Sequence, residues 1–533
     1  MLHRSHRLLA GTALFFVFAA PAFAEDAAPV VTAAADAAAE APPADDIVVL
    51  GFGKARQVQT ISDLDMERLT PGTSPIKAIE KLPGVNYQAA DAFGAYEWSA
   101  RISLRGFNQN QLGFTLDGIP LGDMSYGNSN GLHISRAIIS ENLGSVTVAQ
   151  GAGALGEAST SNLGGTLQFI SRAPSDHFDI VASGTYGSDN TFRAFTRLET
   201  GDLTGNGLKA YISYGFLKTD KWKGWGEQRQ HQVNAKIVQD FGDRGSITAF
   251  FNYSDRREND YQDLSLDIIK RLGYRDDNIS NNFPLAQQIG RVLQNQYAYS
   301  LGAPLPWATA GLTYPRPYQT ADDAYYNAAG LRKDSLGGVT FDANLTDHLT
   351  AKVTGYFHHN QGQGIWFTPY VPTPGGSPLS VRTTEYGINR GGAIARFGWE
   401  MGINKLEVGG WWESNSFHQA RRYYGLLDQD TPSRDSLSFQ KDPFRTDWDF
   451  RFNTDTALYY VSDTLSLGNL TLSGGWKGYQ VINRANPIVS GGLASGRIEA
   501  KDWFLPQAGA VYKIGGGAEV MSRAPYASLN ARW

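Results

Sequence analysis

Residues 349–357 read Leu-Thr-Ala-Lys-Val-Thr-Gly-Tyr-Phe, with apolar or small side chains at every second position. A period of two residues is that of a β-strand with one apolar face and one polar face. Strands of about ten residues whose apolar face ends in Tyr, Trp or Phe are typical of a transmembrane antiparallel β-barrel. A soluble β-sandwich is the alternative, although its strands are usually about five or six residues long. The same alternation recurs in segments that begin near Ile180, Leu208, Val339, Leu406 and Leu470.

The connections between these segments differ in length, which favours the barrel. Phe241–Gly245 is a tight turn, whereas the polar stretch 255–333 is the longest connection. Short turns at one end and long loops at the other are typical of outer-membrane barrels. We predict about 12–14 such strands over residues 176–533. The alternation places Leu208, Ile212, Phe341, Val353 and Leu472 toward lipid, and Lys352, Glu407 and Lys477 toward the lumen.

The first part of the chain is a targeting segment followed by a tether. Arg4 and Arg7 precede an apolar run, and Ala22-Phe23-Ala24 follows it, so residues 1–24 are predicted to be a secretory signal peptide. Residues 25–44 are almost all Ala, Pro and Asp and cannot bury a core. We therefore predict a flexible tether over 25–59.

Residues 60–175 have a different pattern, that of a compact mixed α/β domain. Ser74-Pro75 is a helix start, and Pro83-Gly84 stops the helix. Between these two signals, apolar residues follow helical spacing to Leu82. Short strands are predicted at 102–104, 113–116, 145–148 and 166–170, separated by loops rich in Gly, Asn, Asp and Ser.

No catalytic or metal-binding pattern is present in the sequence. The chain has no cysteine, so thiolate nucleophiles, thiolate metal sites and disulfides are excluded. Its histidines lack the spacing of a zinc site, and no G-x-S-x-G turn occurs. Lys and Arg number 47 against 52 Asp and Glu, which gives no broad basic surface for nucleic acid. We therefore predict neither an enzyme nor a cofactor.

Several motifs in residues 75–167 resemble the plug domain of TonB-dependent outer-membrane receptors. They are Pro75–Val85, Ser103-Leu104-Arg105-Gly106-Phe107, Phe114–Pro120, Val146–Gly151 and Asn162–Leu167. Asp46–Gly51 resembles the TonB box of that family, and the resemblance extends to about Pro174. It implies a plugged barrel in the outer membrane of a Gram-negative bacterium, contacting lipid. Uptake of a scarce ligand would be energised by the periplasmic protein TonB.

The resemblance also implies contact residues. The TonB contact would be Asp46, Ile47, Val48, Val49, Leu50 and Gly51, because a β-branched run on a tether can add as a strand to a partner's sheet. Contacts between plug and barrel are expected at Arg105, Gly106, Asp117 and Gly118. The Arg105 guanidinium has the geometry to pair with a barrel carboxylate such as Glu407. A simple hairpin turn explains Gly118 equally well.

The ligand in this family is most often a ferric siderophore. Aromatic and amide groups suit a large, partly planar ligand, although they also suit packing of a plug against its barrel. A second hypothesis is oligosaccharide uptake, and a third is a non-transporting adhesin or phage receptor that binds through loop 255–333. The siderophore contacts expected in two apical loops are Phe93, Tyr96, Trp98, Tyr126, Asn128 and His133. The candidates for sugar contacts are Asp260, Tyr261, Gln262, Asp263, Trp366 and Trp411.

The barrel is expected to be incomplete. Receptors of this family have 22 strands of about 9–11 residues each, more than residues 175–533 can supply together with their loops. We expect an open sheet with an exposed edge near Val511–Lys513. A smaller barrel that closes around the plug is the alternative.

Overall fold

The computed structural model describes residues 58–62, 66, 68–91, 93–94, 96–122, 131–150, 155–307, 313–515 and 518–524. The predicted signal peptide, the TonB box and the candidates Tyr126 and Asn128 lie outside these residues. Among the described residues, no helix is both long enough and apolar enough to cross a membrane.

Residues 58–171 form a small mixed domain, called the N-terminal domain below. Its five-stranded sheet has the order β1-β7-β8-β5-β6, and its β5 and β8 run parallel. A second sheet has the order β2-β3-β4. The strands are β1 Val58–Ser62, β2 Val85–Gln88, β3 Arg101–Leu104, β4 Phe107–Asn108, β5 Leu112–Leu116, β6 Ile119–Pro120, β7 Leu143–Gln150 and β8 Gly165–Ser171. The helical turns are α2 Pro75–Ala78, η1 Gln109–Gln111, α3 Ile134–Ala137 and η2 Ser140–Asn142.

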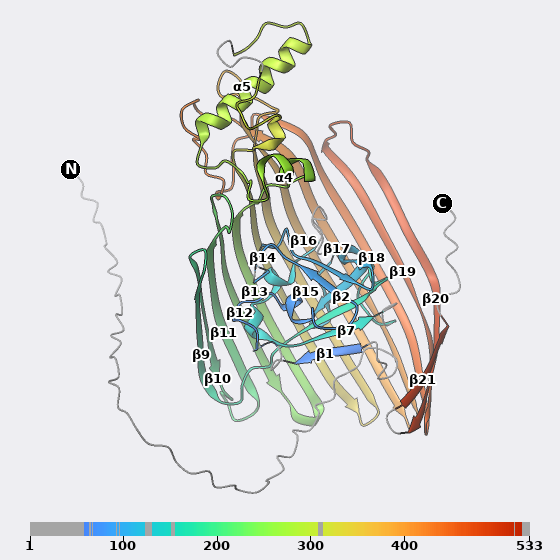
Figure 1. Cartoon of the computed structure of the whole chain (residues 1–533). Helices are drawn as coiled ribbons and strands as arrows, with labels where there is room; N and C mark the ends of the chain where they lie inside the picture. Colours follow the sequence, from blue (N-terminus) through green and yellow to red (C-terminus); the bar gives the residue numbers. More distant parts are fainter. Residues whose placement is uncertain are drawn as a thin grey trace, which may run out of the picture. The chain divides into compact units, whose positions relative to one another are not determined.

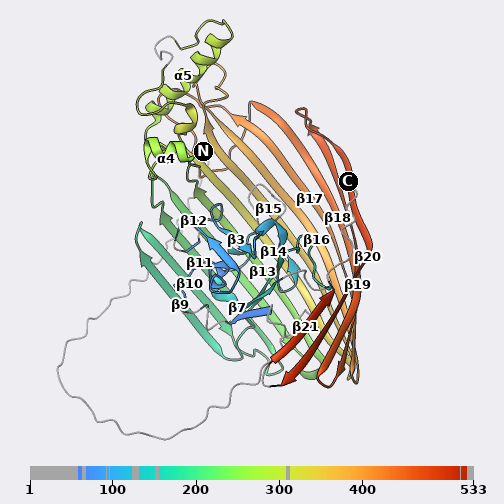
Figure 2. The ribbon, with the colours of Figure 1, turned by 45° about the vertical axis from the view of Figure 1, so that its right-hand side comes forward.

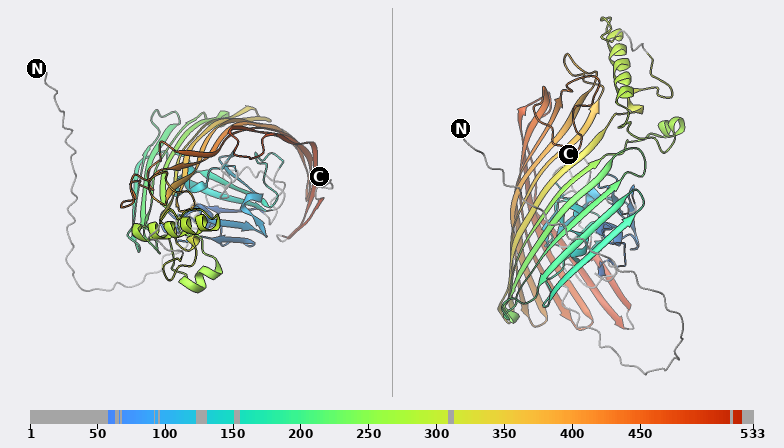
Figure 3. Two further views of the ribbon diagram at one scale, coloured as in Figure 1. Left: turned by 90° about the horizontal axis from the view of Figure 1, so that it is seen from above. Right: turned by 90° about the vertical axis from the view of Figure 1, so that its left-hand side faces the viewer.

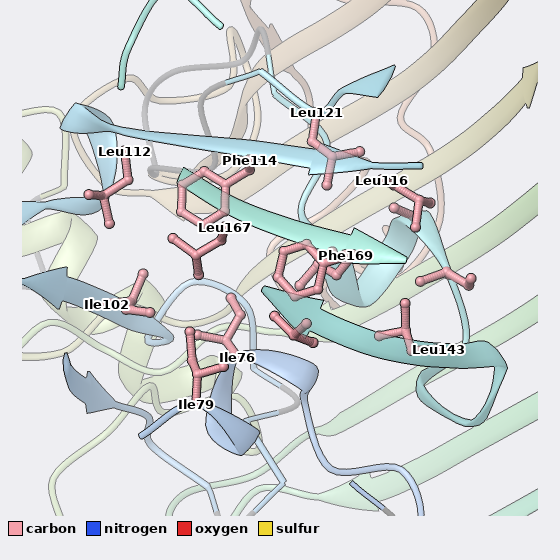
Figure 4. Packing of buried hydrophobic residues seen from close by; sticks show 14 of the residues in the cluster. Ile76, Ile79, Ile102, Leu112, Phe114, Leu116, Leu121, Leu143, Leu167 and Phe169 are labelled. Carbon is pink, nitrogen blue, oxygen red and sulfur yellow. The ribbon is translucent and has the colours of Figure 1, made fainter. Parts of the chain in front are cut away.

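One hydrophobic cluster holds this domain together. Figure 4 shows Phe114 of β5 and Leu167 and Phe169 of β8 above Ile76 and Ile79. All five side chains are at most 2% exposed. Full burial of one such side chain stabilises a fold by roughly 1.5–3 kcal/mol. The cluster therefore fixes the sheet that positions the loops on either side of it.

The sequence predicted this domain with one difference. The four predicted strands are confirmed as β3, β5, β7 and β8. The helix expected to reach Leu82 ends at Ala78. Beyond it, the Ile79 amide donates to the Ile76 carbonyl at 3.3 Å and the Leu82 amide to the Ile79 carbonyl at 3.0 Å. These three-residue turns replace helical hydrogen bonds ahead of Gly84, whose φ of +81° ends the segment.

The described residues from Phe178 onward contain one antiparallel sheet of 13 strands in sequence order. In Figures 1 and 2 the sheet curves around the N-terminal domain. This confirms both the antiparallel fold and the expected number of strands. The strands are β9 Phe178–Gly187, β10 Thr191–Thr200, β11 Leu208–Asp220, β12 Glu227–Asp240, β13 Gly245–Asn259, β14 Ala328–Thr346, β15 Leu349–Thr368, β16 Ser380–Met401, β17 Asn404–Tyr424, β18 Arg445–Leu467, β19 Leu470–Val489, β20 Gly496–Gly515 and β21 Ala518–Ala524.

The two faces of the sheet differ as the alternation predicts. Tyr356 of β15 is buried in the cluster of the N-terminal domain, so even-numbered side chains of β15 point inward. Its neighbour Val353 is 39% exposed on the outer face, and Ile212 of β11 is 53% exposed. Phe341 and Leu472 are also exposed, and Leu208 is half-buried. On the inner face, Lys352 pairs with Asp342 at 3.3 Å, and Lys477 is buried.

An arginine on the outer face tests this assignment. We expect Val353→Arg to destabilise the sheet in a lipid bilayer by roughly 2–4 kcal/mol if Val353 lies near the midplane. The measurement is the folded fraction in vesicles as urea is increased. Lys352→Arg, one residue away on the inner face, is the matched control and should change the urea midpoint little. Equal midpoints for the two variants would contradict the assignment.

The sheet is open among the described strands. Its terminal strands are β9 and β21, and Figure 3 shows the arc from above with the N-terminal domain inside it. The expected open sheet is confirmed, but the position of its edge is wrong. Val511 of β20 pairs with Met521 and Lys513 pairs with Glu519, so β21 covers this segment.

The long connection is shorter than the sequence indicated. Strand β13 continues to Asn259 and β14 begins at Ala328. Charged side chains near the end of β13 form ion pairs within that strand. Arg256 lies 2.9 Å from Glu258 on the inner face, and Arg257 lies 3.1 Å from Asp255 on the outer face. Residues between the two strands include the helical segments α4 Leu266–Leu272, α5 Phe283–Ser300 and η4 Ala321–Asp323.

Candidate ligand-binding site

A pocket of about 330 Å³ lies between the N-terminal domain and two connections of the sheet. This volume is at the lower end for sites that hold small molecules. Part of the lining comes from the segment between β2 and β3 together with the first residue of β3, and the rest from the β11–β12 connection and the residues after β13. The lining residues are Ala90, Tyr96, Trp98, Ser99, Arg101, Trp222, Lys223, Tyr261 and Asp263.

Aromatic side chains form the walls of this pocket. Tyr96 and Tyr261 meet edge to face with ring centroids 5.1 Å apart, and Trp222 lies 6.1 Å from Tyr261. The Trp222 amide also donates to the Tyr261 hydroxyl at 3.1 Å. These contacts fix ring orientations, and fixed aromatic rings offer a large contact area at little entropic cost.

Two cations face the pocket beside one carboxylate. Lys223 places its Nζ 5.7 Å from the Trp222 ring centroid and 5.9 Å from that of Tyr261, and donates to the Asp276 carbonyl at 2.8 Å. Arg101 also lines the pocket, opposite in charge to Asp263. The lining is therefore aromatic with a net positive charge, which favours an anionic, partly planar ligand.

A hydrogen bond from the lining residue Tyr96 connects the two parts of the fold. The Tyr96 hydroxyl donates to Asp260 Oδ1 at 3.2 Å, and Lys221 Nζ donates to the Asp260 carbonyl at 2.8 Å. Burial, followed by the charge of nearby Glu258, raises the pKa of Asp260 to about 7. Burial likewise raises the pKa of Tyr96 well above its usual value.

A cluster of charged side chains begins at Glu97, the residue after Tyr96. Arg136 of α3 donates to Glu97 Oε2 at 2.7 Å and also to Asp334 of β14. Arg256 of β13 lies 3.6 Å from Glu97, and His358 lies 2.9 Å from Asp334. Burial alone would raise the pKa of Glu97, but Arg136 outweighs it and holds that pKa well below its usual range. The cluster thus joins the N-terminal domain to the inner face of the sheet by ionic contacts.

The N-terminal part matches a known family, and the whole fold matches known structures. The family described as TonB-dependent Receptor Plug Domain matches residues 53–166. The N-terminal domain is a TonB-dependent receptor plug. No curated protein matches this sequence.

The plug and its surrounding sheet together have the fold of TonB-dependent receptors. The unliganded ferric citrate transporter FecA is 16% identical, with a TM-score of 0.60 over 87% of this chain and 62% of that chain. The ferric yersiniabactin uptake receptor FyuA of Yersinia pestis is 14% identical, with a TM-score of 0.58 over 87% and 63%. The pyoverdine receptor FpvA of Pseudomonas aeruginosa, solved with pyoverdine bound, is 16% identical, with a TM-score of 0.57 over 87% and 61%. The chain spans about three fifths of the length of these receptors.

The predicted siderophore contacts are only partly brought together. Tyr96 and Trp98 line the pocket. Phe93 is half-buried nearby in the same plug loop, where its carbonyl accepts from the Ser74 amide at 2.7 Å. His133 does not line the pocket. It is a buried N-cap of α3, its Nδ1 accepts from the Ser135 amide at 3.2 Å, and burial lowers its pKa to about 4.

The predicted plug–barrel contacts need one correction. Arg105 does not meet Glu407, because it lies exposed in the turn between β3 and β4 with a φ of +50°. Glu407 instead accepts from the Tyr460 hydroxyl at 2.6 Å and lies 3.6 Å from Arg396. Arg396 in turn donates to the plug carbonyl of Gly156 at 3.4 Å, so Glu407 does stand next to a plug contact.

The glycine turns of the plug are tight hairpins. Asp117 and Gly118 have φ values of +51° and +82° between β5 and β6, a conformation that favours glycine at the second position. Asp117 also accepts from the Ser171 amide at 2.8 Å, which fixes the turn against β8. Gly106 has a φ of +86° in the β3–β4 turn, and a Cβ there or at Gly118 would meet no atom within 4 Å. Turn geometry accounts for these glycines.

Two of the sugar candidates line the same pocket, and the others do not. Tyr261 and Asp263 line it, and Asp260 accepts a hydrogen bond from the lining residue Tyr96. Gln262 is buried, with its backbone N–H donating to Asp277 Oδ1 at 2.7 Å. Trp411 is buried on β17 and donates to the Tyr356 hydroxyl at 2.9 Å, and Trp366 lies under the Arg382 guanidinium.

Sequence reasoning missed Trp222, Lys223 and Arg101 as site residues. The run Lys221-Trp222-Lys223-Gly224-Trp225-Gly226 carried a signal, because two tryptophans and two lysines stand in a short connection between alternating strands. Exposed aromatic residues in a loop on a rigid scaffold indicate binding more often than packing. No such signal marks Arg101, which lies on a strand.

Proposed function

We propose that this chain binds a ferric siderophore on the plug and takes part in its energised uptake across the outer membrane of a Gram-negative bacterium. The observation that carries the proposal is the aromatic, positively charged pocket between the plug loop and the β11–β12 connection. Ferric chelates of citrate-like or catecholate ligands are anionic and partly planar. Cation–π and ionic contacts with Lys223 and Arg101 suit both properties.

The ligands of the similar receptors support the ligand class. They are receptors for ferric citrate, ferric yersiniabactin and pyoverdine. We propose that residues 1–24 direct export, that residues 25–59 form the tether, and that Asp46–Gly51 binds TonB in the periplasm. The fold of outer-membrane receptors supports the location, and the exposed outer face at Ile212 and Val353 supports lipid contact.

Oligosaccharide uptake is the second candidate, because a second pocket next to the first is rich in amides. This pocket of about 470 Å³ shares Arg101 with the first. Amide groups hydrogen-bond to sugar hydroxyls, and aromatic walls stack on sugar rings. Its lining residues are Asn86, Gln88, Arg101, Ile102, Ser103, Asn108, Gln109 and Asn110.

Binding to a Lys223 variant separates the two candidates. We expect Lys223→Gln to weaken ferric citrate binding about fivefold to tenfold, because it removes one of the two cations in the lining. The measurement is quenching of tryptophan fluorescence in the detergent-solubilised chain, with maltoheptaose as the competing probe. Lys405→Gln, a lysine in a strand next to a short turn, is the control and should bind as wild type does.

The outcomes of this titration are distinct. Unchanged ferric citrate affinity in Lys223→Gln would contradict the proposed site. Saturable binding of maltoheptaose without binding of ferric citrate or a ferric catecholate would replace the siderophore with the sugar. Lys223→Arg keeps the charge and should restore most of the affinity.

A further inference from the structure

The outer face of the sheet carries a cluster of cations on β19 and β20. It lies near the end of the sheet where the longer connections, such as residues 425–444, are found. Arg484 of β19 stands opposite Arg497 of β20, and Lys501 stands opposite Gln480 on the same face. Their side chains are 41%, 49% and 56% exposed. This outer-rim cluster, defined as Arg484, Arg497 and Lys501, is separate from the pocket and from the plug.

Two carboxylates hold the outer-rim cluster in place. Asp455 of β18 lies 2.8 Å from Arg484, and Glu499 lies 2.5 Å from Arg497 and 3.6 Å from Lys501. Three cations thus share two anions, and the cluster keeps a net positive charge. Neighbouring carboxylates also pre-order the guanidinium groups, which lowers the cost of binding a further anion.

Exposed aromatic side chains lie directly next to the cluster along the same strands. Trp503, two residues beyond Lys501, stacks on Tyr459 with ring centroids 6.2 Å apart. Both rings are exposed on the outer face, at 46% and 37%. Aromatic rings at this position are typical of the boundary between hydrocarbon and headgroups. The cations therefore stand where headgroup phosphates would lie.

A second cluster of the same kind lies on the outer face near the opposite edge of the sheet, on β11 and β12. Glu227 of β12 lies 2.9 Å from Lys218 of β11 and 3.6 Å from Arg229. Phe216, two residues before Lys218, packs against Phe192 with centroids 6.2 Å apart. Cations that share fewer carboxylates, next to an aromatic pair, thus occur at two places on the outer face.

We propose that the outer-rim cluster binds the phosphate groups of an anionic lipid in the outer leaflet, with the acyl chains lying along Trp503 and Tyr459. The proposal rests on the membrane location given under Proposed function. A lipid is favoured over a free anion because charge and exposed apolar surface adjoin, so one amphiphile satisfies both. Arginine suits phosphate because its planar fork binds two oxygens at once.

Native mass spectrometry of the detergent-solubilised full chain tests this proposal. The probe is diphosphoryl lipid A, compared with the same lipid after removal of its phosphates. Each cation near an anionic surface contributes a factor of about five to binding. Arg484→Gln/Arg497→Gln/Lys501→Gln should therefore weaken binding more than tenfold. Binding to wild type should also fall as salt is raised.

Two further variants keep the test decisive. Arg484→Lys/Arg497→Lys/Lys501→Arg retains the charges and should keep most of the affinity. Lys405→Gln removes one cation from a strand end next to a short turn and should bind as wild type does. Ferric citrate quenching should be the same in the triple Gln variant and in wild type, so a folded pocket is checked independently.

Three results would overturn the proposal. The first is equal lipid A binding by wild type and the triple Gln variant. The second is equal binding of the dephosphorylated lipid, which would leave only acyl contacts. The third is tighter binding of inorganic phosphate alone than of the lipid, which would make this a site for a free anion. Failure of ferric citrate to bind wild type would count against the uptake proposal and not against lipid binding.

Discussion

Replacing Arg136 with methionine is expected to loosen the plug inside the sheet by about 3–5 kcal/mol. The guanidinium is buried between Glu97 of the plug and Asp334 of β14. Without it, the Glu97 and Asp334 carboxylates lose the cation that they share, although Arg256 stays 3.6 Å from Glu97 and His358 stays 2.9 Å from Asp334. An unpaired buried charge costs far more than the lost pair contributes, so the urea concentration at which protease reaches the plug should fall markedly.

Arg105→Met is the matched control for this experiment. Arg105 is an exposed plug arginine in a turn, so its loss should change the free energy of opening by less than about 0.5 kcal/mol. Arg136→Lys keeps the charge but loses the planar fork and should give an intermediate midpoint. Equal midpoints for Arg136→Met and wild type would show that the ionic cluster does not hold the plug.

Replacing Val48 with proline is expected to reduce uptake of labelled ferric citrate in energised cells to background. Proline lacks an amide donor, so it blocks the addition of residues 46–51 as a strand to the edge of TonB. Surface binding of the label by de-energised cells should stay unchanged, because the pocket lining among the described residues comes from 90–101, 222–223 and 261–263. Val48→Ala keeps the amide and is the control. Normal uptake by Val48→Pro would contradict the prediction that Asp46–Gly51 binds TonB.

The strands were predictable because their signal is local. Alternation over residues 349–357 needs no knowledge of the rest of the chain, and β15 bears it out, with Val353 outside and Tyr356 inside. The strand lengths were not predictable, because the upper ends are polar on both faces. Residues 255–258 of β13 belong to the strand although neither face is apolar there. Arg256 pairs with Glu258 on one face, and Arg257 pairs with Asp255 on the other.

The site was predictable only in part, because its halves come from distant segments. Tyr96 and Trp98 stood out as aromatics in a plug loop, but nothing local shows that Tyr261 packs against Tyr96. The same distance explains the Arg105 error. The sequence contains many carboxylates that could pair with Arg105. In the fold, Glu407 lies next to Arg396 instead. His133 has a polar side chain in an apical loop, but that side chain is used to cap α3.

The strands of this sheet differ greatly in length, and the pocket does not lie at the longest of them. Strands β9 and β10 have 10 residues each, whereas β18 has 23. At about 3.3 Å per residue, β18 is roughly 40 Å longer. The pocket lies beside the shorter strands, at the connections that follow β11 and β13. The connection that follows β13 also carries α4 and α5, whereas the longest strands lie further along the sheet. A macromolecule seated on the ends of those longest strands would therefore lie away from the connections that line the pocket.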